Sequence, residues 1–151
     1  MTLKEIKKII YPENHNHILG ALINHQLKDL QYIVMNPLRI NFIDISTLDG
    51  YSVYTRSLIF VLYKAVSNIF PRKALRTEYF ISNGIYCRLG NKDLSQTPEI
   101  IDTLRNEMQK IIDYDIPIIR EDIPTEKAVQ IFRKQGFKDK ADLMETRGKL
   151  Y

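Results

Sequence analysis

The sequence is poor in the residues and motifs that several common function classes require. Its single cysteine, Cys87, excludes an internal disulfide framework and a multi-thiolate metal site, and we expect a reducing, cytoplasmic setting. No run approaches the ~20 apolar residues of a membrane-spanning helix, so we expect no membrane role. No G-x-x-x-x-G-K-[ST] motif occurs, because Gly148 and Lys149 are followed by Leu150. This chain by itself therefore cannot bind ATP in the P-loop manner.

What the chain does contain is the composition of an ordinary folded protein. Apolar residues make up 44% and charged residues 26% of its 151 residues, which argues against long disorder. The formal charge of +4 permits contact with RNA, nucleotides or other anions. Because the basic residues are spread along the whole chain, the same charge also fits a solvated surface.

The first 50 residues have the pattern of a small helix-and-sheet unit. Thr2 can cap a short helix that ends near Tyr11. Runs rich in β-branched and large apolar residues then predict three strands, over 18–24, 31–35 and 40–46. A turn leads into a long helix over 51–70, which Pro71 closes.

The rest of the chain predicts a hairpin, helices and one further strand. The hairpin joins 77–83 to 85–89 at Asn83-Gly84, a dipeptide that supplies the backbone angles of a tight turn. Further elements are a helix from Thr97 to about 113, a strand over 116–122, a helix over 125–136 and a tail helix from 138 that stops before Arg147. The fold class is α+β, with mainly antiparallel sheets.

The long helix carries two different stripes. Leu58, Leu62 and Ile69 belong to an apolar stripe that faces a core. Arg56, Phe60, Lys64 and Ser67 form a second stripe, on which each cation lies about one turn from Phe60. This second stripe faces either solvent or a cleft.

Several separated motifs occur in the order of a known domain. From Arg56 to about Leu143 they are a helix, a proline-ended basic turn, the SNGIYC hairpin, an acidic helix, the IPIIRED strand and the AVQIFRKQGFKDK helix. This order resembles the second additional domain of threonyl-tRNA synthetases, which alanyl-tRNA synthetases and their free-standing editing relatives share. The resemblance implies an editing-domain-like unit over 51–151.

The preceding segment resembles the later part of a TGS domain, a small ubiquitin-like module, through LGALINHQLKDLQYIV and INFIDIST. A whole TGS domain begins with a β-hairpin, whereas here a helix starts at Thr2. The resemblance therefore implies a truncated TGS-like unit over 1–50. A missing hairpin would leave one sheet edge unpaired, and a second copy can pair with such an edge, so a homodimer is a candidate assembly.

Over essentially the whole chain, the sequence also resembles the N-terminal region of bacterial nucleoside (uridine) kinase-like proteins. The motifs that carry this resemblance are NFIDIS, RSLIFVLYKAV, SNGIYC, FRKQGF and TRGKLY. In that family the same two modules precede a P-loop kinase domain. The resemblance implies a ligand-binding or regulatory module, with a downstream kinase domain as a partner in the parent gene.

The editing chemistry does not transfer to these residues. In the synthetase editing domain a His-x-x-x-His pair lies on the first long helix, and the alignment puts Arg56 and Phe60 at those positions. An arginine accepts no proton and phenylalanine has no polar atom. Lys140 matches a cleft lysine of the synthetases, and Cys87 falls in the hairpin that borders the cleft. We therefore expect no catalytic residue, metal or cofactor in this chain.

The candidate ligand-binding residues are Arg56, Phe60, Lys64, Cys87, Arg88 and Lys140. Uncompensated cations in a cleft predict an anionic ligand, a nucleotide or RNA. In the alternative hypothesis, Arg56 pairs with Asp44 or Glu78 and only ties the helix to a sheet. At the level of function, the alternatives are a surviving hydrolase that deacylates mischarged tRNA and a structural module that only dimerises.

Two other motifs favour structural interpretations. His15 and His17, with His25, could suggest a metal or nuclease site, but they lack a placed carboxylate or thiolate set and fit a polar loop. Cys87 could be a nucleophile, but no histidine follows His25, and a cysteine in an apolar strand is usually a small core residue.

Overall fold

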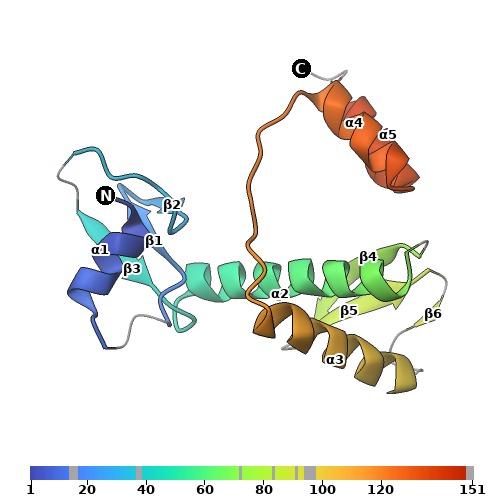
Figure 1. Cartoon of the computed structure of the whole chain (residues 1–151), viewed down its shortest axis with the longest axis horizontal. Helices are drawn as coiled ribbons and strands as arrows, with labels where there is room; N and C mark the ends of the chain where they lie inside the picture. Colours follow the sequence, from blue (N-terminus) through green and yellow to red (C-terminus); the bar gives the residue numbers. More distant parts are fainter. Residues whose placement is uncertain are drawn as a thin grey trace. The chain divides into compact units, whose positions relative to one another are not determined.

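The computed structural model describes residues 1–13, 17–36, 39–71, 73–82, 84–90, 92–93 and 98–148 (Figure 1). The chain forms two compact units, Met1–Phe60 and Val61–Tyr151. Helix α2 (Leu48–Ile69) contributes residues to both. Within the described ranges there are five helices and two three-stranded antiparallel sheets, which confirms the predicted α+β class.

Helix α1 (Leu3–Ile10) begins the first unit with the predicted cap. The backbone N–H of Glu5 donates to Thr2 Oγ1 at 3.3 Å, and the N–H of Thr2 donates to Glu5 Oε2 at 2.8 Å. The backbone hydrogen bond from Thr2 holds the pKa of Glu5 below its ordinary value. These reciprocal bonds satisfy N–H groups that the start of a helix leaves unpaired.

The sheet of the first unit has the order β2-β1-β3, with β1 (Gly20–Ile23), β2 (Gln26–Lys28) and β3 (Ile40–Ile43). The predicted strand over 31–35 is wrong, because only an isolated bridge from Ile33 to Thr2 forms there. Asn24 and His25 have φ angles of 50° and 63°, which is the backbone of a tight hairpin turn. That turn pairs β1 at once with β2, so local turn geometry outweighs the apolar pattern further along.

Helix α2 starts at Leu48, three residues before the predicted start. Thr47 Oγ1 accepts the N–H of Gly50 at 3.1 Å, which caps this earlier beginning. Gly50 is buried, and a Cβ added there would lie 1.7 Å from the carbonyl oxygen of Asp44. Only glycine therefore permits this close approach between the helix start and the loop before it.

The second unit contains β4 (Leu75–Ile81), β5 (Gly84–Leu89), β6 (Lys92–Asp93) and α3 (Pro98–Asp113). The predicted hairpin is confirmed as the β4-β5 pair, although Asn83 of its turn and the predicted cap Thr97 lie outside the described residues. In Figure 1, α3 runs alongside the second half of α2. Both helices pack on one face of the hairpin in a core of Ala65, Val66, Leu75, Leu89, Leu104 and Ile111.

The chain then extends to α4 (Thr125–Lys134) and α5 (Lys138–Gly148), which pack on each other. The turn between them contains Gly136, whose φ is 84°. Helix α5 runs to Gly148 rather than ending before Arg147. The predicted strand over 116–122 is wrong, because this segment pairs with no strand of the described chain and Pro117 has no N–H to donate.

Candidate functional site

Arg56, Phe60 and Lys64 lie four residues apart on α2, and all three are exposed. Arg56 and Phe60 belong to the first unit and Lys64 to the second. Phe60 is 58% exposed, and other large apolar residues of α2, such as Leu48 and Tyr51, are exposed as well. These residues form an exposed basic and aromatic stripe, which we call the α2 stripe.

The guanidinium of Arg56 is held by its own helix. Its Nη2 donates to Ser52 Oγ at 2.7 Å, one turn earlier. In the described part of its own unit, no carboxylate lies within ion-pair distance of Arg56. A guanidinium has five N–H donors, and the hydrogen bond to Ser52 uses one of them.

The two acids considered as partners for Arg56 bind other groups. Glu78 Oε1 lies 3.5 Å from Nη1 of Arg88. Asp44 Oδ1 accepts from the hydroxyl of Ser46 at 2.5 Å and from its N–H at 2.9 Å. The Ser46 hydroxyl, followed by its N–H, lowers the pKa of the Asp44 carboxyl.

Lys140 lies on α5, next to an aromatic residue of α2. Its Nζ is 4.5 Å from the centre of the Tyr63 ring and 4.8 Å from that of Phe137. Tyr63 donates its hydroxyl to the carbonyl of Leu75 at 3.0 Å, which fixes the ring. The contact with Tyr63 therefore joins α5 to α2 within the second unit, whereas the contact with Phe137 is local to the turn before α5.

Cys87 and Arg88 are neighbours on β5 and face opposite sides of the sheet, as successive strand residues do. Cys87 is half-buried and packs against the core with Leu89. Its thiol donates to the carbonyl of Ile85 at 3.6 Å, and burial raises its pKa. A raised pKa disfavours the thiolate, so the structure gives Cys87 a packing role.

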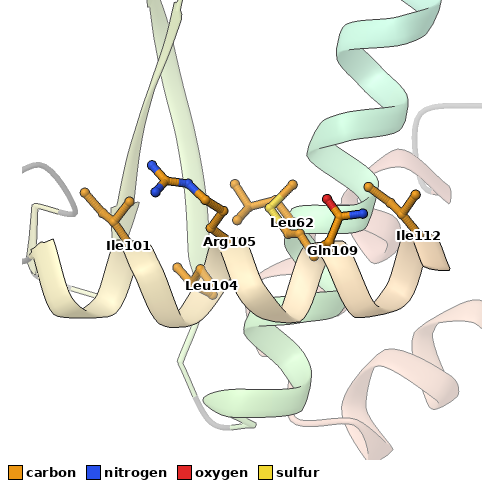
Figure 2. Close-up of a pocket in the computed structure, with 7 residues that line it drawn as sticks. Leu62, Ile101, Leu104, Arg105, Gln109 and Ile112 are labelled. Carbon is orange, nitrogen blue, oxygen red and sulfur yellow. The ribbon is translucent and has the colours of Figure 1, made fainter. Parts of the chain in front are cut away.

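The described part of the second unit contains a groove between α2 and α3, with a volume of about 360 Å³. Figure 2 shows Ile101, Arg105, Gln109 and Ile112 projecting from one side of α3, near Leu62 of α2. None of the predicted site residues lines it. Sequence reasoning missed the groove, although the apolar spacing of Ile101, Leu104 and Met108 could have indicated it.

Lys7 is a second feature that sequence reasoning missed. Its side chain is only 6% exposed, and its Nζ donates to the carbonyl of Ile18 at 3.4 Å. Burial, followed by the charges of Lys4 and Lys8, lowers the pKa of this amine. The sequence did contain an indication of this burial, because Lys7 lies four residues after Leu3, on the apolar side of α1.

The described ranges contain neither a cluster of side chains that could hold a metal ion nor a membrane-spanning helix. Among those residues, which leave out His15, no three His, Cys, Asp or Glu side chains lie close enough together to hold a metal ion. Nor does any helix there combine the length and the apolarity needed to cross a lipid bilayer.

The comparisons with known proteins point to one enzyme. No protein-family model matches the chain. A threonine–tRNA ligase of Desulforamulus reducens is 30% identical over 136 residues, 89% of this chain and 21% of the ligase. The ligase of Thermotoga neapolitana is 27% identical over 123 residues (80% of this chain, 19% of the ligase), and that of Bdellovibrio bacteriovorus 25% over 146 (95% and 22%).

The chain therefore spans about a fifth of the length of the curated relatives that it matches. The similarity covers most of the chain and recurs in ligases from three organisms. These observations establish that the chain is distantly homologous to a region of threonyl-tRNA synthetases.

Proposed function

We propose that this chain is a non-catalytic, anion-binding module derived from a threonyl-tRNA synthetase editing region, and that its ligand is RNA or a nucleotide. The observation that carries this proposal is the exposed pair of Arg56 and Phe60 on α2. They occupy the positions at which the resemblance expects a histidine pair. A guanidinium and a phenyl ring can bind a phosphate and a base, but neither can hold a metal or activate water.

The contacts of the α2 stripe support an anionic ligand. Arg56 is anchored by Ser52 and keeps most of its donors for a fork-like contact with phosphate. Lys64, two turns further along, adds a point charge, and Phe60 between them offers a ring face for stacking. Lys140 supplies a further cation in the second unit, where it borders Tyr63.

The second candidate is a hydrolase that deacylates mischarged tRNA. It is favoured by the similarity to threonine–tRNA ligases over 80–95% of the chain in the three relatives described. An editing hydrolase of that type needs groups that accept a proton or ligate a metal, which Arg56 and Phe60 do not provide. Release of amino acid from mischarged threonine tRNA, lost in Arg56→Ala, would establish this candidate in place of the first.

The binding experiment uses the whole chain with fluorescently labelled RNA and with nucleotides, at about 50 mM and about 200 mM salt. We expect binding that weakens with salt and is reduced in Arg56→Ala. Arg105→Ala is the matched control, because Arg105 is an exposed arginine on α3 that pairs with Asp102. Undetectable binding at low salt, with Arg56→Ala lowering only thermal stability, would make Arg56 a structural residue.

The two remaining partner proposals concern assembly. The resemblance to nucleoside kinases suggests a P-loop domain downstream, and the reading frame beyond Tyr151 in the gene tests that proposal. A homodimer is tested by the mass of the chain in sedimentation equilibrium.

A further inference from the structure

The face of the β4-β5 hairpin opposite the core carries a distinctive set of side chains. Leu75, Cys87 and Leu89 face the core, so alternation along the strands puts Arg76, Tyr86 and Arg88 on the other face. Thr77 pairs with Cys87 and Phe80 with Ile85, so Glu78 and Tyr79 both lie opposite Tyr86. This is a β-bulge, and it brings Tyr79 to the outer face.

Two tyrosines form a stacked pair on this outer face. The ring centres of Tyr79 and Tyr86 are 5.0 Å apart, with an angle of 18° between the ring planes. Tyr79 is 54% exposed. Stacking fixes both rings in advance, so a further flat ring can add to the exposed side of Tyr79 without much loss of side-chain entropy.

Two arginines stand directly opposite each other beside this stack. Arg76 and Arg88 are paired across β4 and β5. Arg88 has one carboxylate partner, Glu78, at 3.5 Å, whereas Arg76 is exposed and lies in no ion pair of the described chain. Like charges in directly opposed positions destabilise a sheet, so an anion bound between them would be stabilising.

The stacked tyrosines therefore offer an aromatic surface for a base, and the two arginines beside them offer cations for phosphate. Single-stranded RNA is bound in this way, with bases stacked on aromatic side chains of a sheet and cations along the backbone. We propose that the outer face of the β4-β5 hairpin is a binding site for single-stranded RNA. A base stacks on Tyr79, and Arg76 and Arg88 contact the phosphates that flank it. The site is separate from the α2 stripe and does not depend on it.

The test measures the dissociation constant of a fluorescein-labelled single-stranded RNA decamer for the whole chain by fluorescence anisotropy. We expect Tyr79→Ala to weaken binding by about tenfold or more, the range seen when a stacking platform loses one base contact. Arg76→Ala removes a phosphate contact, so we expect it to weaken binding and to reduce the dependence of binding on salt. Tyr114→Ala and Arg105→Ala are the matched controls, since Tyr114 is 78% exposed and both side chains lie outside this face. Circular dichroism verifies that each variant is folded.

The first two of four possible results separate this site from the α2 stripe. Loss of RNA binding in Tyr79→Ala and Arg76→Ala, with unchanged binding in Arg56→Ala, supports the hairpin site and argues against the stripe. Unchanged binding in Tyr79→Ala and Arg76→Ala, with loss in Arg56→Ala, overturns the hairpin site and leaves the stripe. Absence of RNA binding by the unmodified chain at about 50 mM salt overturns the site. So does a dimer that Tyr79→Ala converts to a monomer, because a second copy of the chain would then cover the face.

Discussion

The ammonium of Lys140 lies 4.5 Å from the centre of the Tyr63 ring, and this contact ties α5 to α2 within the second unit. Resemblance alone assigned Lys140 to a ligand cleft. In the structure its ammonium lies over two aromatic rings, those of Tyr63 and Phe137. A lysine in such a position contributes to stability whether or not it also contacts a ligand.

The first prediction follows from this contact. Lys140→Met keeps an unbranched side chain that is one atom shorter and removes its charge, so we expect the free energy of unfolding to fall by about 1 kcal/mol. Urea denaturation measures it, with Lys138→Met, at the exposed start of α5, as the control. Equal stability of Lys140→Met and the unmodified chain would contradict a docking role.

The second prediction concerns the buried amine of Lys7. The Lys7 ammonium donates one long hydrogen bond, to the carbonyl of Ile18. This single bond compensates poorly for the hydration that the charge loses on burial. Lys7→Met keeps the apolar stem, so we expect the first unit to be more stable by about 1 kcal/mol at neutral pH. Lys8→Met is the control, because Lys8 is exposed on the same helix.

This difference depends on pH in a fixed direction. The ordinary pKa of a lysine, 10.5, applies to the unfolded chain, and the pKa of Lys7 in the folded state is lower. The unfolded chain therefore binds the proton more tightly. Between the lowered pKa and 10.5 the folded chain has lost this proton and the unfolded chain still holds it, so stability rises with pH across that range. The advantage of Lys7→Met should shrink across that range, and a constant advantage from neutral to alkaline pH would show that packing rather than charge causes it.

The third prediction uses two glycines as a matched pair. A Cβ at position 50 would lie 1.7 Å from the carbonyl oxygen of Asp44, whereas at position 84 its nearest contact would be 3.6 Å away. We expect Gly50→Ala to destabilise the chain by about 3 kcal/mol, because the clash is with backbone that must move. Thermal unfolding would show a large shift for Gly50→Ala and a small one for Gly84→Ala.

The sequence predicted the elements whose signals are local. Thr2 and Glu5 specify the helix cap through adjacent residues, and that cap is present. The β4-β5 hairpin is also present, but Gly84 pairs with Ile81 as the first residue of β5 rather than lying in the turn as predicted. The stripe of Arg56, Phe60 and Lys64 was also predicted, because helical spacing alone places these residues on one face.

The sequence could not predict features that depend on distant partners. Alternation places Cys87 and Arg88 on opposite faces, but which of the two faces meets α2 and α3 is a tertiary property. The stack of Tyr79 on Tyr86 needs the bulge, which the sequence does not reveal. The apolar alternation around Ile118 is that of a strand, but a strand also needs a partner to receive its hydrogen bonds.

The fourth prediction tests that last point. Ile118 and Ile119 are 65% and 76% exposed in the segment that leads to α4. Removing an exposed side chain loses little burial, so we expect Ile118→Ser and Ile119→Ser each to change the free energy of unfolding by less than about 0.5 kcal/mol. Leu104→Ser is the contrasting variant, because Leu104 is 4% exposed in the core and should cost several times more. If either isoleucine variant were as damaging as Leu104→Ser, residues 116–122 would be a buried strand, and the sequence pattern would be the better guide to this segment.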